Sequence, residues 1–189
     1  MSTPSPESAP KKKKSKRKKK FWTNEKILSL SAIFMSACTL LVLIYQTNLM
    51  RQQQAMSVYP HLQLINNGTN SPKFKYSLTN TGVGPALIKS VTINYKGKVH
   101  EMVDLATHLA RTIPEDSLNY SHSNIMPGQL IPPNNTIHIA ELNSGGSAAA
   151  RKLYSYIHDK ELEFEIEYAS IYGDKWMLSK KRYVPEKLE

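Results

Sequence analysis

Six histidines are the side chains of this sequence best suited to acid–base or metal chemistry: His61, His100, His108, His122, His138 and His158. None of them forms a metal pair at helical spacing. A zinc site usually draws on several Cys and His ligands, and the chain has one cysteine, Cys38. We therefore expect neither a metal nor a cofactor.

Two arrangements could serve a hydrolase. Asp104 and His108 are four residues apart in a segment with helical spacing, where they would share a face, but a surface ion pair explains them equally simply. Ser121-His122-Ser123 lacks the context of a nucleophile elbow, and only its geometry could identify a catalytic pair. The sequence favours a protein that is not an enzyme, with an extracytoplasmic hydrolase as a remote alternative.

Two further groups of side chains could bind a ligand. Four carboxylates alternate with apolar residues at Glu161, Glu163, Glu165 and Glu167, a pattern typical of the solvated face of a half-buried strand, although two of them could hold a cation. The aromatic residues of the C-terminal third could form a recognition patch, but we expect most to pack in the core. They are Tyr154, Tyr156, Tyr168, Tyr172, Trp176 and Tyr183.

One apolar segment determines how the chain must be organised. Residues 27–45 carry no charge over 19 positions, and a helix of that length measures about 28 Å, close to the hydrocarbon thickness of a bilayer. The sequence predicts a transmembrane helix over 27–45. We expect it to be anchored in lipid by Ile27, Leu30, Leu41 and Ile44, with Phe21 and Trp22 at one interface and Tyr45 at the other.

Basic residues are concentrated before this segment. Residues 1–26 hold 10 of the 25 Lys and Arg, so the remaining chain is nearly neutral, and nucleic acid is not an expected partner of the folded part. We expect 1–26 to be a disordered cytoplasmic tail and the C-terminal domain to be periplasmic or extracellular. The tail would contact anionic headgroups through Lys11, Lys12, Lys13, Lys14, Lys16, Arg17, Lys18, Lys19 and Lys20.

Three other interpretations of the apolar segment stay open. It could be a cleaved signal peptide or a buried core helix. It could also be a lipoprotein signal, since Met35-Ser36-Ala37-Cys38 loosely resembles a lipobox, although Met replaces the usual Leu and apolar residues continue beyond Cys38. The flanking aromatic and charged residues favour a retained single-pass signal-anchor.

Residues 46–58 favour a helical stalk, because they include no Gly or Pro and precede Pro60. Val42, Leu49 and Met56 are spaced seven apart, which leaves open a homodimer through the span and stalk.

Residues 59–189 predict a domain of about seven short strands, at 61–65, 74–78, 86–95, around 98–99, 136–140 and 162–168, with 176–178 and 182–184 completing a final strand. Short helices are predicted over 102–112 and over 148–157, the second capped by Ser147, and 114–133 is predicted to be irregular. The expected fold is mainly β: an antiparallel Ig-like β-sandwich with one or two short inserted helices.

The segment Phe74–Tyr95 contains Asn80-Thr81-Gly82-Val83-Gly84-Pro85-Ala86, a turn in which we expect the glycines to adopt positive φ and Pro85 to direct the exit. This segment resembles bacterial Ig-like modules. The order of span, Gln-rich stalk and Tyr-Pro entry is similar to that of uncharacterised bacterial single-pass membrane proteins. The resemblance implies a fold and no activity.

The sequence thus favours a membrane-anchored, non-enzymatic binding or assembly module that presents its β-sandwich to another envelope component, with a protein as the expected partner. The alternative is that the polybasic tail recruits anionic lipid or nucleic acid at the cytoplasmic face, with the outer domain as a sensor.

Overall fold

A computed structural model describes residues 23–114 and 117–188, except the side chain of Tyr183. The predictions for Lys11–Lys20, Phe21 and Trp22 lie outside these residues. The chain divides into two compact units between Asn48 and Leu49, within the predicted stalk, and each unit is described by itself.

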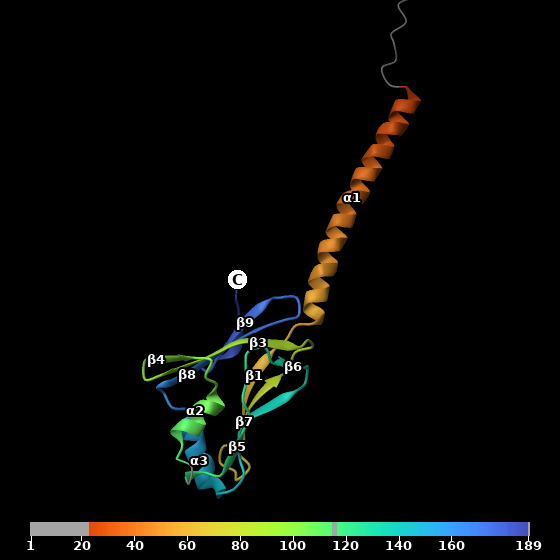
Figure 1. Ribbon diagram of the computed structural model, residues 1–189. Coiled ribbons are helices and arrows are strands. Elements are labelled where there is room, and N and C mark those ends of the chain that lie inside the picture. Colours follow the sequence, from red (N-terminus) through yellow and green to blue (C-terminus); the bar gives the residue numbers. More distant parts are fainter. Residues whose placement is uncertain (1–22, 115–116, 189) are drawn as a thin grey trace, which may run out of the picture. The chain divides into compact units, whose positions relative to one another are not determined.

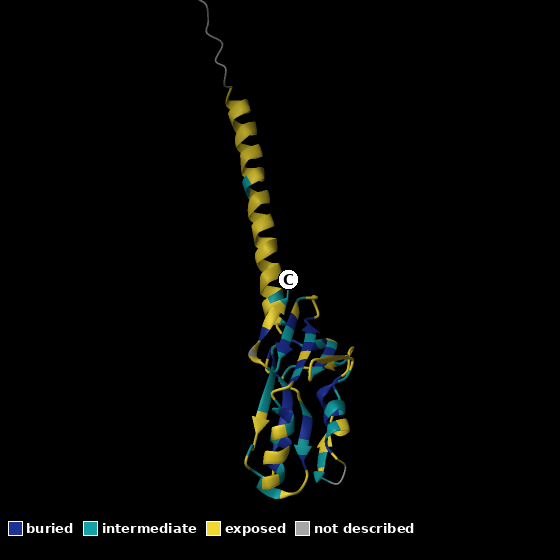
Figure 2. Ribbon diagram, turned by 90° about the vertical axis from the view of Figure 1, so that its left-hand side faces the viewer, coloured by how far each residue is buried: buried dark blue, intermediate teal, exposed yellow. Residues whose placement is uncertain are grey.

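One long helix, α1 (Asn24–Ser57), contains both the predicted span and the predicted stalk (Figure 1). Its 34 residues, at 1.5 Å per residue, extend about 50 Å. The Ser29, Ser36 and Thr39 hydroxyls each donate to the carbonyl four residues earlier, over 2.9 Å, so the helix satisfies these polar groups itself. No residue of α1 is buried, and the helix is long and apolar enough to span a membrane (Figure 2).

Two antiparallel sheets form the second unit. Sheet A contains, in spatial order, β1 (Leu62–Asn67), β2 (Lys75–Asn80), β7 (Thr136–Leu142) and β5 (Tyr120–His122). Sheet B contains β10 (Arg182–Leu188), β9 (Lys175–Ser179), β8 (Leu162–Ala169), β3 (Ala86–Tyr95) and β4 (Lys98–Glu101), and the short β6 (Leu130–Ile131) pairs with the start of β3. Helix α2 (Leu105–Thr112) follows β4, and α3 (Gly146–Ile157) connects β7 to β8.

The strand order is that of an immunoglobulin-like sandwich. The order β1-β2-β7-β5 corresponds to the ABED sheet of that fold, and β9-β8-β3-β4 corresponds to strands G, F, C and C′, with β10 added at the outer edge of β9. The prediction of a mainly β, antiparallel Ig-like sandwich with short inserted helices is therefore confirmed.

Alternating residues build the core between the sheets. Strand β8 buries Leu162, Phe164, Ile166 and Tyr168 while the glutamates between them face outward. Helix α3 adds a buried stripe of Ala150, Leu153 and Ile157 at its helical spacing. The core is thus assembled by a period of two on the strands and of 3.6 on the helix.

Two predictions about local structure were wrong. The segment predicted to be irregular, 114–133, contains β5 and β6, whose three and two residues are too few to show an alternating pattern. Ser147 is not the cap of α3: Gly145 occupies that position with a φ of 112°, and no side chain caps the helix. Because Gly145 and Gly146 both adopt positive φ, the chain turns into the helix earlier than the Ser147 signal indicates.

Candidate functional site

The predicted turn at Asn80 is a structural joint. The Asn80 side chain is fully buried, and its Nδ2 donates to the carbonyls of Gly84 and Ile131, over 2.8 and 3.0 Å. Its Oδ1 accepts from the backbone N–H of Gly82 at 3.0 Å and of His61 at 3.2 Å. Since each amide atom makes two bonds inside the protein, we assign Asn80 to folding and not to ligand binding.

The glycines of this turn are needed for space, which corrects the prediction that they adopt positive φ. Neither Gly82 nor Gly84 has a positive φ. A Cβ at Gly82 would overlap the backbone of Tyr59 and His61, and one at Gly84 would overlap the Val58 carbonyl. The amides of Val83 and Gly84 both donate to the Tyr59 carbonyl, over 3.0 and 3.2 Å. The turn therefore clamps the segment by which the chain enters the domain, and Pro85 leads from it into β3.

Asp104 and His108 do not form the predicted surface pair. The Asp104 carboxylate is 5 % exposed and accepts from Thr107 N, Asn124 Nδ2 and Ile125 N, over 2.8–3.1 Å, so it caps α2 and fastens the following loop. The His108 ring instead packs against Tyr95, with centroids 4.8 Å apart. Burial, reinforced by the neighbouring His100, lowers the pKa of His108. The two side chains thus have separate structural roles.

The histidines and serines of sheet A do not form an accessible catalytic pair. Ser121 and His122 are exposed on β5, and the Ser121 hydroxyl donates to Asn143 Oδ1 at 3.3 Å. A pair that sequence reasoning missed joins Ser77 Oγ to His138 Nδ1 at 2.8 Å across β2 and β7, because 61 residues separate the two. Ser77 is buried, so a substrate cannot reach its hydroxyl.

The glutamate stripe is the solvated face of β8. Lysines of neighbouring strands and turns pair with it: Lys175 with Glu167 at 3.1 Å, Lys96 with Glu161 at 3.9 Å, and Lys181 with Glu163. In residues 23–114 and 117–188, no three His, Cys, Asp or Glu side chains lie close enough to hold a metal ion. The stripe therefore acts through ion pairs on the surface.

Most of the C-terminal aromatic residues are at least partly buried. Tyr168 and Trp176 are buried and stack at 5.7 Å, Tyr154 and Tyr156 are half-buried, and Tyr172 is exposed. The Tyr183 side chain lies outside the described part of the chain. The aromatic residues are therefore mainly core, as expected.

The predicted anchor residues of α1 all lie on an exposed helix surface: Ile27, Leu30, Leu41, Ile44 and Tyr45 are between 50 and 70 % exposed. No protein surface in the first unit covers them. They are thus available to a surrounding apolar solvent.

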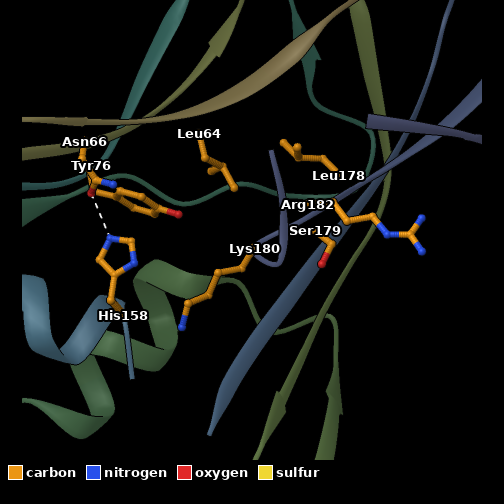
Figure 3. A pocket seen from close by; sticks show the side chains of 8 residues that line it. All are labelled: Leu64, Asn66, Tyr76, His158, Leu178, Ser179, Lys180 and Arg182. Atoms are coloured by element: carbon orange, nitrogen blue, oxygen red, sulfur yellow. Dashed lines mark hydrogen bonds between the residues drawn. The ribbon is translucent and has the colours of Figure 1, made fainter. Parts of the chain in front are cut away.

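A small polar cleft opens where the β1 edge of sheet A meets β9 and β10 of sheet B (Figure 3). It encloses about 70 Å³, over a floor of Leu64, Tyr76 and Leu178. Its rim is polar and contains no carboxylate: Asn66, His158, Ser179, Lys180 and Arg182. No local motif marks this site in the sequence, because its residues come from β1, β2, the end of α3 and the β9–β10 turn.

The polar groups of the cleft hold one another in place. His158 Nε2 bonds Asn66 Oδ1 at 3.0 Å, and since that oxygen can only accept, the network assigns the ring proton to Nε2. The Lys180 ammonium donates to the carbonyls of Asp159 at 2.6 Å and Leu162 at 2.8 Å. In Figure 3, Tyr76 extends its hydroxyl into the space between Leu64 and Lys180, while the Arg182 guanidinium turns outward, where Glu186 pairs with it.

The electrostatics of the cleft follow from its partial burial. Burial lowers the pKa of His158, and the nearby Lys180 lowers it further, so the imidazole is neutral at pH 7. Burial also lowers the pKa of Lys180, although Asp159 and Glu163 act in the opposite direction. The cleft therefore places the Lys180 amino group, whose charged form the two carboxylates favour and burial disfavours, beside the His158 imidazole.

No protein family model, curated protein sequence or solved structure matches this chain. Its function must therefore be inferred from the fold and from the sites described above.

Proposed function

We propose that this protein is a single-pass membrane protein whose C-terminal domain is a non-enzymatic binding or assembly module held outside the cytoplasm. The observation that carries the proposal is an apolar helix that buries none of its residues although its backbone bonds are satisfied. Met35, for example, is 67 % exposed near the middle of the segment. Each such side chain would cost about 1.5–3 kcal/mol in water relative to an apolar surrounding, which a bilayer supplies.

Charge supports the orientation. Ten basic residues precede the span within the first 26, whereas Arg51 is the first to follow it. Translocation disfavours a strongly basic flank, so the N-terminal side would be retained in the cytoplasm. In that orientation the second unit, Leu49–Glu189, would be periplasmic or extracellular.

The position of the cleft supports a binding role. The chain enters the domain at Tyr59 and Pro60, and β1 runs from there to Asn66 at the cleft, a distance of roughly 20 Å along a strand. The cleft therefore lies further along β1 than the clamped entry, and none of its lining residues belongs to the turn that closes that entry.

Protease protection tests the orientation. We expect protease added to intact spheroplasts to degrade Tyr59–Glu189 while an N-terminal tag survives until the cells are lysed. Crosslinking in intact cells should then recover a specific extracytoplasmic partner. A protected domain with an accessible N-terminal tag would overturn the orientation, and recovery of the chain in the soluble fraction would overturn the anchor.

The role of the polybasic tail is tested separately. Replacing Lys11–Lys20 with Ser and Gly should change only insertion and orientation if the run is a topology signal. Loss of binding to anionic vesicles without a change in orientation would favour the alternative that the tail recruits lipid.

A further inference from the structure

We propose that the cleft between β1 and the β9–β10 turn binds a single oxyanion group, a carboxylate or a phosphate, on an extracytoplasmic ligand. This inference rests on the proposed function, because it assigns the ligand chemistry of the domain that the span would hold outside the cytoplasm. The probe that identifies it is a small anion, so the two claims can fail independently.

The charge of the cleft favours an anionic ligand. Among the described residues, no carboxylate oxygen lies within ion-pair distance of the Lys180 ammonium. The nearby acidic groups are occupied elsewhere: Glu163 pairs with Lys181, Glu186 pairs with Arg182, and Asp159 Oδ1 accepts from the Glu161 amide at 3.0 Å. The Lys180 ammonium is thus contacted directly by two carbonyl dipoles, while the Asp159 and Glu163 carboxylates act on it only from beyond ion-pair distance, and an anion in the cleft would add a countercharge in direct contact.

Three hydrogen-bond donors of the cleft residues remain for a ligand. The Lys180 ammonium has three N–H groups, and its two carbonyl partners leave one for a ligand. Asn66 uses its oxygen toward His158, which leaves its amide Nδ2 as a donor. Ser179 Oγ accepts from the Lys181 amide at 3.2 Å, so its hydroxyl can donate to a ligand. Three donors with one positive charge select an oxyanion over a neutral hydroxyl.

The volume of the cleft limits the size of the group that can bind there. A cleft of about 70 Å³ has room for a few waters, which is also the scale of one carboxylate or phosphate group, and it is far smaller than the pockets that enclose whole cofactors. The Leu64 and Leu178 side chains and the ring of Tyr76 limit how deeply water competes for the charge, while the Tyr76 hydroxyl faces the cleft. The group that binds would therefore be the end of a larger ligand that continues outside the cleft.

The test uses the full chain in a neutral maltoside detergent. Sodium phosphate and sodium acetate are titrated in turn at constant ionic strength, and the backbone amides of Ser179 and Lys180 are followed by NMR. We expect saturable shifts with at least one anion; tighter binding of phosphate indicates a phosphate ligand, and tighter binding of acetate a carboxylate. Glucose, as a neutral probe, should cause no saturable shift.

Two matched pairs of variants locate the site. Lys180→Gln should weaken binding at least tenfold, whereas Lys89→Gln, which removes the same charge from an exposed position of β3 outside the cleft, should bind as the wild type does. Because Lys180 also fastens two carbonyls, Asn66→Asp provides a second variant: it places a carboxylate at the rim but can still accept from His158. Asn67→Asp makes the same charge change outside the cleft and should leave binding unchanged.

The proposal is overturned if the wild type shows no saturable shift with either anion. It is also overturned if Asn66→Asp binds as tightly as Asn67→Asp. If the anion binds but protease protection places the domain in the cytoplasm, then the cleft assignment stands and the proposed location fails. If the domain lies outside the cytoplasm but neither anion binds, then the proposed location stands and the cleft assignment fails.

Discussion

At the scale of single residues, this domain uses buried amide and carboxylate groups to fasten loops. Asn80 joins its turn to His61 and Ile131, and Asp104 joins α2 to the loop at Asn124 and Ile125. Both side chains have the chemistry of a binding or catalytic site, but they make their hydrogen bonds to other groups of the protein. Buried polar groups of this kind are costly to unpair and specify one arrangement of the loops around them.

Gly84→Ala should destabilise the domain by at least about 1–3 kcal/mol, the usual cost of overpacking, because the new methyl would overlap the Val58 carbonyl. Denaturant unfolding measures the loss. Gly97→Asn is the control: Gly97 has a φ of 74°, which Asn tolerates, and its missing Cβ faces open space, so little change is expected. Equal stability of Gly84→Ala and the wild type would show that the clamp at Val58 is looser than described.

Acidification should weaken the fold in a defined window. Burial lowers the pKa of His108 and of His158 below 6.5, so between that value and each folded pKa the unfolded chain binds protons that the folded chain does not. The free energy of unfolding therefore falls as the pH drops below about 6.5. Thermal unfolding between pH 7.5 and 5.5 measures it. The double variant His108→Gln, His158→Gln should show a shallower pH slope, and His122→Gln, exposed on β5, should keep the wild-type slope.

At the scale of elements, α1 contrasts with the core strands of the sandwich. Each strand of the core buries one face, whereas α1 buries none of its residues although it is more apolar. Its composition suits a surrounding of lipid, and its seven-residue spacing of Val42, Leu49 and Met56 keeps a homodimer through the span and stalk as a prediction. In the membrane that we propose, solvation of α1 by lipid would be a source of stability separate from packing in the sandwich.

Met35→Arg should impair membrane insertion, because an arginine at the centre of a span costs about 2.5–3.5 kcal/mol. We expect a clear drop in the fraction of protein that stays in membranes after carbonate extraction. Leu49→Arg, on the same helix but beyond the predicted span, should remain fully membrane-bound. If the two variants fractionate alike, the span does not end at Tyr45.

At the scale of the whole molecule, the proposed membrane location would give the two units different solvents, lipid for the first and water for the second. The second unit has its own core and its own hydrogen-bonded entry, which Tyr59 and the turn at Asn80 close. The stability of this unit should therefore not require the span. The span in turn requires only its own backbone bonds and an apolar surrounding.

Removing residues 1–48 should leave a soluble, folded domain. We expect the shortened chain to unfold in a single cooperative transition, with a midpoint within a few degrees of that of the full chain in detergent. Circular dichroism and calorimetry measure both. Aggregation or loss of cooperativity in the shortened chain would show that the first unit contributes to the core of the second.

Local patterns in the sequence determined much of this architecture. The uncharged run 27–45 defines the span, since a helix of that composition has no stable place in water, and the period-two alternation of segments such as 162–168 defines strands with one buried face. The same alternation predicted the solvated glutamate stripe. These features depend on neighbours in sequence, which the sequence displays directly.

Tertiary structure alone decided the rest, because it depends on contacts between distant residues. The short strands β5 and β6 form because β7 and β3 offer them edges, and the glycines of the turn are required by the backbone of Val58 to His61, a separate and earlier segment of the chain. The cleft joins Asn66 to His158, which lie 92 residues apart, and places Lys180 beside them. No local sequence pattern predicts this cleft. Its side chains are brought together by the pairing of β1 with β2 and of β8 with β9, and by the packing of α3.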